Sequence, residues 1–235
     1  MSVEITPVQT KRERRRFLTF PWQVFRGDRL WVPPLLSEQA ERIDPQRGVW
    51  FNHGTAEFFA AWRAGKMMGT ICCAEDHDLN TQQARCEAVF GFNHYFPDYE
   101  VAVSLWRHAE SWARGRGLER IVGPFDLDYE NAYGILVEGY DRPPTLMCGH
   151  TPPYYREFVE RYGFRPQRGQ NIALELPLQG LDDEQSRLGK VRRVADLVRR
   201  RGSVRVRSAK LDDWDNEIDR VVYLLNRALA VLPDF

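Results

Sequence analysis

The chain has little of what marks several large classes of protein. Only four of its 235 residues are cysteines, and they form neither a C-x-x-C pair nor a zinc-ligand spacing. Its five histidines are also isolated from one another in the sequence. We therefore expect reduced thiols, no bound metal and a cytoplasmic location.

Neither sign of charge is in excess, because Lys plus Arg and Asp plus Glu each count 33. The chain as a whole thus provides no field that would attract nucleic acid. Long apolar runs are also missing. Residues 1–16 lack the apolar segment of a signal peptide, and no uncharged stretch long enough to span a bilayer follows. We expect a globular protein with no nucleic-acid partner and no integral membrane segment.

The apolar residues that are present predict an α/β fold. Residues 56–74 contain two strand-like segments separated by a turn at 63–65, which is typical of a β-hairpin. Residues 103–117 place their apolar side chains on one helical stripe and end at Gly117, which predicts a C-cap. Strands are predicted on both sides of this helix, at 87–95 and 120–124.

Elements elsewhere in the chain are less regular. Residues 2–8 alternate like a strand, and the helix predicted at 10–26 begins with a capping box of Thr10 and Glu13. The remaining expected elements are a helix within 31–51, a polar turn at 75–83, a short helical segment at 129–138, a strand-like piece at 144–148, a helix at 152–162 and a strand at 171–176.

The succession of strand, helix and strand at residues 87–124 resembles the core of the GNAT superfamily of acyl-CoA N-acyltransferases. The helix that ends in Tyr162-Gly163-Phe164 resembles a later helix of the same family. The resemblance implies a mixed, mainly antiparallel sheet flanked by helices. It also implies acyl-CoA as the acyl donor and a small-molecule amine as the acceptor.

The family's glycine-rich phosphate loop aligns with residues 97–102, where only the last small residue is kept. Such a loop brings backbone N–H groups to a pyrophosphate at a helix N-terminus. Here Pro97 has no N–H, while Asp98 and Glu100 place carboxylates where phosphates would lie. Acidic residues also favour helix initiation by themselves. We expect no tight binding of CoA.

By resemblance, the residues nearest to any acyl donor lie at the end of the fourth strand and the start of the following helix. They are Phe92, Asn93, Asp98, Glu100, Val101 and Ala102. Gly91 could mark the point where the fourth and fifth strands separate, or it could simply pack under an aromatic ring.

A polar group at residues 126–131 follows the predicted fifth strand, at the end where open α/β sheets bind ligands. From it we take Glu130 as the candidate base. In the alternative interpretation, Asp126 and Asp128 only cap and solvate a turn.

The tyrosine that commonly serves the family as an acid aligns with Val159 and is therefore absent. We take Tyr154 or Tyr155 as its replacement. Two functions of different classes follow: an N-acyltransferase whose donor is held by other residues or by a further domain, or a catalytically inactive GNAT-fold module that binds a small molecule or a protein.

The C-terminal part of the chain resembles the start of a second domain. Residues 203–207 echo residues 2–6, and a helix is predicted at 212–231. We expect a GNAT-like domain at 1–180, a linker with a basic helix at 181–202 and an incomplete second domain at 203–235. An uncharacterised bacterial subgroup of GNAT-like proteins has such tandem domains and shares these motifs: Phe20-Pro21-Trp22, Trp31-Val32-Pro33-Pro34-Leu35, Phe59-Ala60-Ala61-Trp62-Arg63, Gly123-Pro124, Gly139-Tyr140-Asp141 and Pro153-Tyr154-Tyr155.

Two amphipathic helices are predicted in this part. The helix within 181–202 is basic and could bind RNA, an anionic lipid surface or an acidic partner, although a solvated linker helix is the simpler interpretation. The later helix has an apolar face with no complete domain to cover it, so we expect a homodimer through the C-terminal segment. That face consists of Trp214, Ile218, Val221, Val222, Leu224, Leu225 and Leu229.

Overall fold

A computed structural model describes the chain at residues 2–127, 131, 133–145, 148–167, 172–174, 187–202 and 207–229. The chain divides into two compact units, Met1–Gln170 and Asn171–Phe235.

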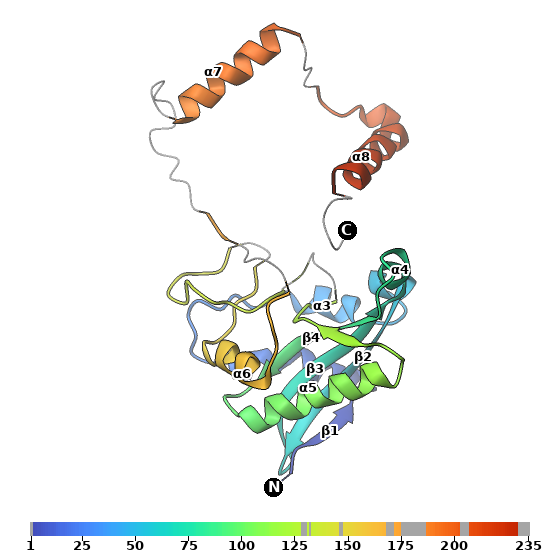
Figure 1. The fold of residues 1–235 in the computed structure, drawn as a ribbon, viewed down its shortest axis with the longest axis vertical. Helices are drawn as coiled ribbons and strands as arrows, with labels where there is room; N and C mark the ends of the chain where they lie inside the picture. Colours follow the sequence, from blue (N-terminus) through green and yellow to red (C-terminus); the bar gives the residue numbers. More distant parts are fainter. Residues whose placement is uncertain are drawn as a thin grey trace. The chain divides into compact units, whose positions relative to one another are not determined.

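The first unit is built on a five-stranded sheet with the order β1-β2-β3-β4-β5 (Figure 1). The first four strands are antiparallel to their neighbours, and β5 is parallel to β4. The strands are β1 Glu4–Pro7, β2 Gly54–Arg63, β3 Lys66–Asp76, β4 Glu87–Tyr95 and β5 Arg120–Val122. The predicted mixed and mainly antiparallel sheet is confirmed.

Helices cover both faces of this sheet, and further helices form the second unit. The described helices of the first unit are α1 Lys11–Thr19, α2 Pro21–Val24, α3 Leu36–Arg42, α4 His77–Gln82, α5 Tyr99–Arg114 and α6 Tyr154–Tyr162, with a short 3-10 helix, η1 Val49–Asn52. The second unit has α7 Arg187–Arg200, the 3-10 helix η2 Leu211–Asp213 and α8 Trp214–Leu229.

The core has one layer on each face of the sheet. Adjacent residues of β2 show this most clearly, because Phe59 packs with the α5 side chains and Phe58 packs with those of α1. This alternation is the normal consequence of the two-residue repeat of a strand. On the α5 face, Leu105 and Trp106 are completely buried, as the predicted apolar stripe requires.

Local signals set several boundaries as predicted. The side chain of Thr10 caps α1 and Glu13 bonds back to the Thr10 N–H, which is the predicted capping box. The β2–β3 hairpin turns at Ala64 and Gly65, both with positive φ, as two-residue hairpin loops usually require. Gly163 ends α6 with a φ of 104°.

Other predicted elements were wrong in extent or type. The predicted helix at 10–26 is divided into α1 and α2, with Pro21 beginning the second. The predicted turn at 75–83 is instead the end of β3 and the helix α4, whose N-cap Asp76 accepts the Leu79 N–H at 2.8 Å. The long helix begins at Tyr99 rather than residue 103 and is capped by Gly115 rather than Gly117.

Three weaker predictions fail where they can be checked. Residues 133–138 are not helical, and Tyr133 instead forms an isolated bridge with Phe125. The described residues of 144–148 and of 171–176 lie outside any strand. Residues 203–206, where the echo of the first strand was predicted, lie outside the described residues.

The strands β4 and β5 separate after three paired residues, the last pair being Val89 and Val122. Beyond this point the chain that follows β5 crosses directly over Gly91. A Cβ built on Gly91 would lie 1.6 Å from the Phe125 carbonyl oxygen. Gly91 is therefore packed under backbone, at the point of separation.

We predict that Gly91→Ala lowers the free energy of unfolding by about 1–3 kcal/mol, because the added methyl group forces the crossing segment away from β4. Gly115→Ala is the matched control, since its Cβ would meet nothing closer than 3.4 Å. That variant should change stability by less than about 1 kcal/mol. Urea unfolding curves measure both, and equal midpoints for Gly91→Ala and the wild type would contradict the crossing geometry.

Candidate functional site

The N-terminus of α5 is capped by its own aspartate. Asp98 Oδ1 accepts the Val101 N–H at 3.2 Å, and the Asp98 carbonyl accepts the Ala102 N–H at 3.2 Å. The side chains of Val101 and Ala102 are fully buried in the α5 layer of the core. The backbone donors predicted to face an acyl donor are thus bonded to Asp98.

A cation from the neighbouring hairpin joins this cap. Arg63, the last residue of β2, bonds Asp98 Oδ2 through Nη1 and Glu100 Oε2 through Nη2, the latter at 2.6 Å. The side chains of Arg63 and Asp98 are only about a quarter exposed, at 23% and 24%. Guanidinium and carboxylates therefore form one internal ion cluster at the helix N-terminus, and the sequence prediction missed its cation.

After β4 and β5 separate, the chain segment that follows β5 hydrogen-bonds to the edge of β4. The Phe125 N–H donates to the Phe90 carbonyl at 2.8 Å. The Phe92 N–H donates to Asp126 Oδ1 at 2.6 Å. Asp126 therefore does more than cap a turn, because it binds a backbone donor at the point where the two strands separate.

The two candidate tyrosines come together at the end of the same strand. The Tyr95 N–H donates to the Tyr155 hydroxyl at 3.0 Å, and the Tyr154 hydroxyl donates to the Tyr95 carbonyl at 2.6 Å. The rings of Tyr95 and Tyr155 stack with centroids 4.2 Å apart. The hydroxyls of Tyr154 and Tyr155 thus both hydrogen-bond to the backbone of Tyr95, at the end of β4.

Burial dominates the electrostatics of these tyrosines. Desolvation raises the pKa of the Tyr154 and Tyr155 phenols above their usual range, so both are neutral at physiological pH. Tyr155 is only 1% exposed, whereas Tyr154 is half-buried. Glu130, the candidate base, lies outside the described residues, so its distance from these hydroxyls stays a matter of prediction.

Phe92 and Asn93 have different surroundings although they are adjacent. Phe92 has a φ of 45° and packs against Phe17 and Phe58 on the α1 face. Asn93 is 4% exposed, and its amide oxygen and nitrogen have no hydrogen-bond partner among the described residues. A buried amide without partners is costly, so Asn93 is an unusual polar position in the interior of this unit.

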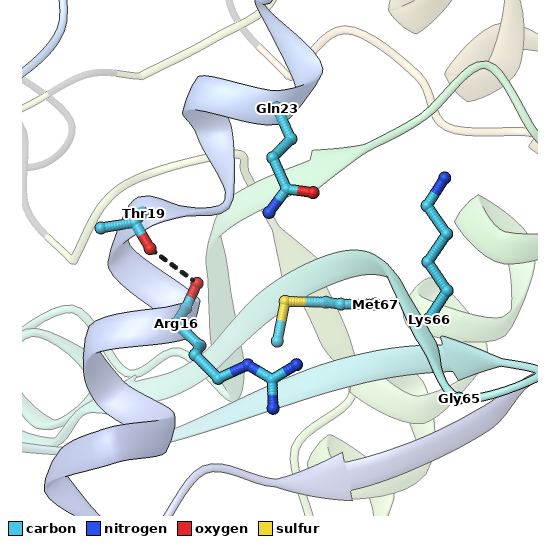
Figure 2. Close-up of a pocket in the computed structure, with 6 residues that line it drawn as sticks. All are labelled: Arg16, Thr19, Gln23, Gly65, Lys66 and Met67. Atoms are coloured by element: carbon cyan, nitrogen blue, oxygen red, sulfur yellow. Dashed lines mark hydrogen bonds between the residues drawn. The ribbon is translucent and has the colours of Figure 1, made fainter.

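A separate hollow of about 280 Å³ lies between α1, α2 and the β2–β3 turn. Figure 2 shows the side chains of Arg16 and Gln23 approaching Met67 in this hollow. Met67 belongs to the core layer on the α1 face, so the hollow is on the side of the sheet opposite α5. None of the predicted site residues lines it.

Metal and membrane signals are absent from the described residues. No group of three or more His, Cys, Asp or Glu side chains there could hold a metal ion. Burial in the protein interior lowers the pKa of His94 to about 4, so this histidine is neutral at physiological pH. Among the helices that the structure describes, none has the length and apolar character to span a membrane.

Comparison with curated proteins gives relatives that are longer than this chain. No family model matches the chain. It is 30% identical over 231 residues to the bacterial ceramide synthase of Caulobacter vibrioides, which covers 96% of the chain and 57% of that protein. It is also 30% identical over 158 residues to Protein YghO of Escherichia coli, covering 66% of the chain and 39% of that protein. The chain thus spans about half the length of these relatives.

The topology of the first unit decides the fold. Four antiparallel strands lead into α5, which returns the chain to a fifth strand parallel to the fourth, and the two strands then separate. The first unit has a GNAT-like fold.

Comparison with solved structures gives neighbours at low sequence identity. A putative acetyltransferase from Pyrococcus furiosus is 18% identical, with a TM-score of 0.42, over 75% of this chain and 100% of that one. A tandem GNAT protein from the clavulanic acid biosynthesis pathway is 14% identical, with a TM-score of 0.44, over 69% of this chain and 43% of that one.

We predict that Tyr155→Phe lowers the free energy of unfolding by about 1–3 kcal/mol, because it leaves the Tyr95 N–H buried without an acceptor. Tyr223→Phe is the control, since Tyr223 is 58% exposed on α8. That change should cost less than about 0.5 kcal/mol. Chemical denaturation of the two variants gives the comparison, and a Tyr155→Phe protein as stable as the control would rule out the bond to Tyr95.

Proposed function

We propose that the chain supplies the GNAT domain of an N-acyltransferase that attaches a fatty acyl group to the nitrogen of a long-chain amino alcohol. The observation that carries this proposal is the alignment with the bacterial ceramide synthase, which covers 96% of the chain. A ceramide is the amide of these two components. Because the chain spans 57% of that relative, the activity is proposed for the whole protein rather than for this segment alone.

The proposed reaction forms a bond between the amine nitrogen and the acyl carbonyl carbon, and breaks the bond between that carbon and the donor's leaving group. The nitrogen loses a proton to a base, and the leaving group gains one from an acid. We assign the base to Glu130. We favour Tyr154 over Tyr155 as the acid, since Tyr155 is buried and its oxygen already accepts the Tyr95 N–H.

We further propose that the acyl donor is held outside residues 97–102. The cap on Val101 and the ion cluster of Arg63, Asp98 and Glu100 support this part of the proposal. A pyrophosphate at this position would have to displace one carboxylate from its N–H donor and approach a second. The Arg63 guanidinium already bonds both carboxylates, so it offers a phosphate little free positive charge.

The donor site then belongs to other residues of this domain or to a further domain. The second choice agrees with the length of the relatives, of which this chain covers 57% and 39%. In this arrangement the segment at residues 203–235 is the opening of that further domain, and the exposed apolar face of α8 supports this part of the proposal.

A catalytically inactive module is the second candidate. The observation that favours it is the occupation of β4: the Phe92 N–H is bonded to Asp126, and both backbone groups of Tyr95 are bonded to tyrosine hydroxyls. An acyl group that entered between the separated strands would find these donors in use. Donor binding and turnover therefore have to be measured separately.

For donor binding, we predict that calorimetric titration of this chain with acetyl-CoA gives a Kd no tighter than about 1 mM, or about 4 kcal/mol of binding free energy. The double variant Asp98→Gly, Glu100→Gly should bind more tightly, because it removes both carboxylates and restores glycine at the helix N-terminus. Glu38→Gln with Glu41→Gln, on α3, removes the same charge elsewhere and should leave binding unchanged. Micromolar binding by the wild type would refute the proposal that the acyl donor is held outside residues 97–102.

For turnover, we predict that the full-length protein forms an amide from a fatty acyl thioester and a long-chain amino alcohol, detected by mass spectrometry. Glu130→Gln and Tyr154→Phe should each lower kcat by about 100-fold, the usual scale of general acid–base catalysis. Exposed Glu138→Gln serves as the control for Glu130. Wild-type rates in both variants would show that these groups are not the base and acid, and absence of product would favour the inactive module.

A further inference from the structure

The helix α7 has two chemically distinct faces. Val191, Val194 and Leu197 recur at helical spacing and are 61%, 61% and 49% exposed. Arg199 lies on the opposite side of the helix, and Arg193 and Arg200 flank the stripe, because a residue advances by about 100° per position. The structure therefore leaves an apolar stripe uncovered along a strongly basic helix.

Charge is concentrated here although the whole chain is neutral. Residues 187–201 contain seven Lys and Arg residues and one acidic residue, Asp196. The protein as a whole has a formal net charge of zero. A basic helix with an exposed apolar stripe gives a neutral protein a local binding surface rather than a general attraction for anions.

We propose that α7 docks in the plane of an anionic lipid bilayer. Its valines and leucine enter the boundary between headgroups and acyl chains, and its arginines remain at the level of the lipid phosphates. The proposal goes beyond the proposed acyl transfer and requires neither acyl donor nor amine. It would also bring the domain to the surface where a long-chain amine resides.

A bilayer explains the pattern of α7 better than a nucleic acid does. The phosphodiesters of a nucleic acid can pair with the arginines of α7, but they cannot bury its exposed stripe of valines and leucine. Proteins that bind single strands usually add aromatic side chains for stacking, and α7 has none. Charge also separates α7 from α8, whose exposed apolar face is accompanied by Asp215, Glu217 and Asp219. Of these two helices, only α7 is therefore complementary to a negatively charged surface.

Flotation of the full chain with lipid vesicles tests the proposal. The wild type should float with vesicles of phosphatidylcholine and about one third phosphatidylglycerol but not with pure phosphatidylcholine, and salt above about 0.5 M should weaken binding. Arg193→Glu with Arg200→Glu should lower the vesicle partition coefficient at least about tenfold. Val194→Ser with Leu197→Ser should lower it to a similar degree. Arg12→Glu with Arg15→Glu, on exposed positions of α1, makes the same charge change and should leave partitioning unchanged.

Circular dichroism and gel filtration confirm that each variant is folded. Loss of binding in the charge variant alone would overturn in-plane insertion and leave simple electrostatic adhesion. Equal binding to neutral and anionic vesicles by the wild type, which needs no variant, would overturn the proposal outright. Tight binding of a single-stranded RNA that is lost in the arginine variant, without binding to vesicles, would assign the helix to nucleic acid.

Discussion

The separation of β4 from β5 after Val89 is the constraint from which the rest of the site follows. Once the neighbouring strand departs, the backbone groups along β4 need other partners, because buried N–H and C=O groups are rarely left unpaired. In this protein the partners come from its own chain. The Phe125 N–H and the Asp126 carboxylate hydrogen-bond to the first part of this edge, and the tyrosine hydroxyls of α6 hydrogen-bond to its end.

The N-terminus of α5 is also hydrogen-bonded within the chain. An uncapped helix N-terminus attracts anions through its free N–H groups and its dipole. Asp98 supplies that anion from within the chain, and Arg63 neutralises part of the resulting negative charge. The domain therefore keeps a GNAT-like scaffold, while the backbone groups that the sequence resemblance assigned to the acyl donor are bonded internally. Under the proposed function, the acyl donor is held by other residues or by a further domain.

Sequence periodicity predicted the scaffold because the scaffold depends on local patterns. The stripe of α5, the capping box of α1 and the positive-φ turn at Gly65 are all encoded within a few residues. The helix α4 was missed because it is polar and carries no apolar repeat, although the aspartate at its N-cap is a usable signal. Homodimer formation through the apolar face of α8 stays a prediction.

The site was less predictable because its contacts join residues far apart in the sequence. Asp98 and Glu100 lie at the start of α5, but their partner Arg63 lies 35 residues from Asp98. Asp126 lies 34 residues from the Phe92 N–H that it binds. Sequence could bring Tyr154 and Tyr155 forward as candidates, yet it could not show that one is buried and the other half-buried.

Backbone donors at the end of β4 and the start of α5 are occupied by the protein itself. Titration of acetyl-CoA into isotope-labelled protein, with individual backbone amides followed by NMR, distinguishes such occupied donors from free ones. The amides of Phe92, Tyr95, Val101 and Ala102 should keep their chemical shifts and their slow hydrogen exchange throughout the titration. Saturable shifts of the Val101 and Ala102 amides at micromolar acetyl-CoA would contradict this occupation of the donors.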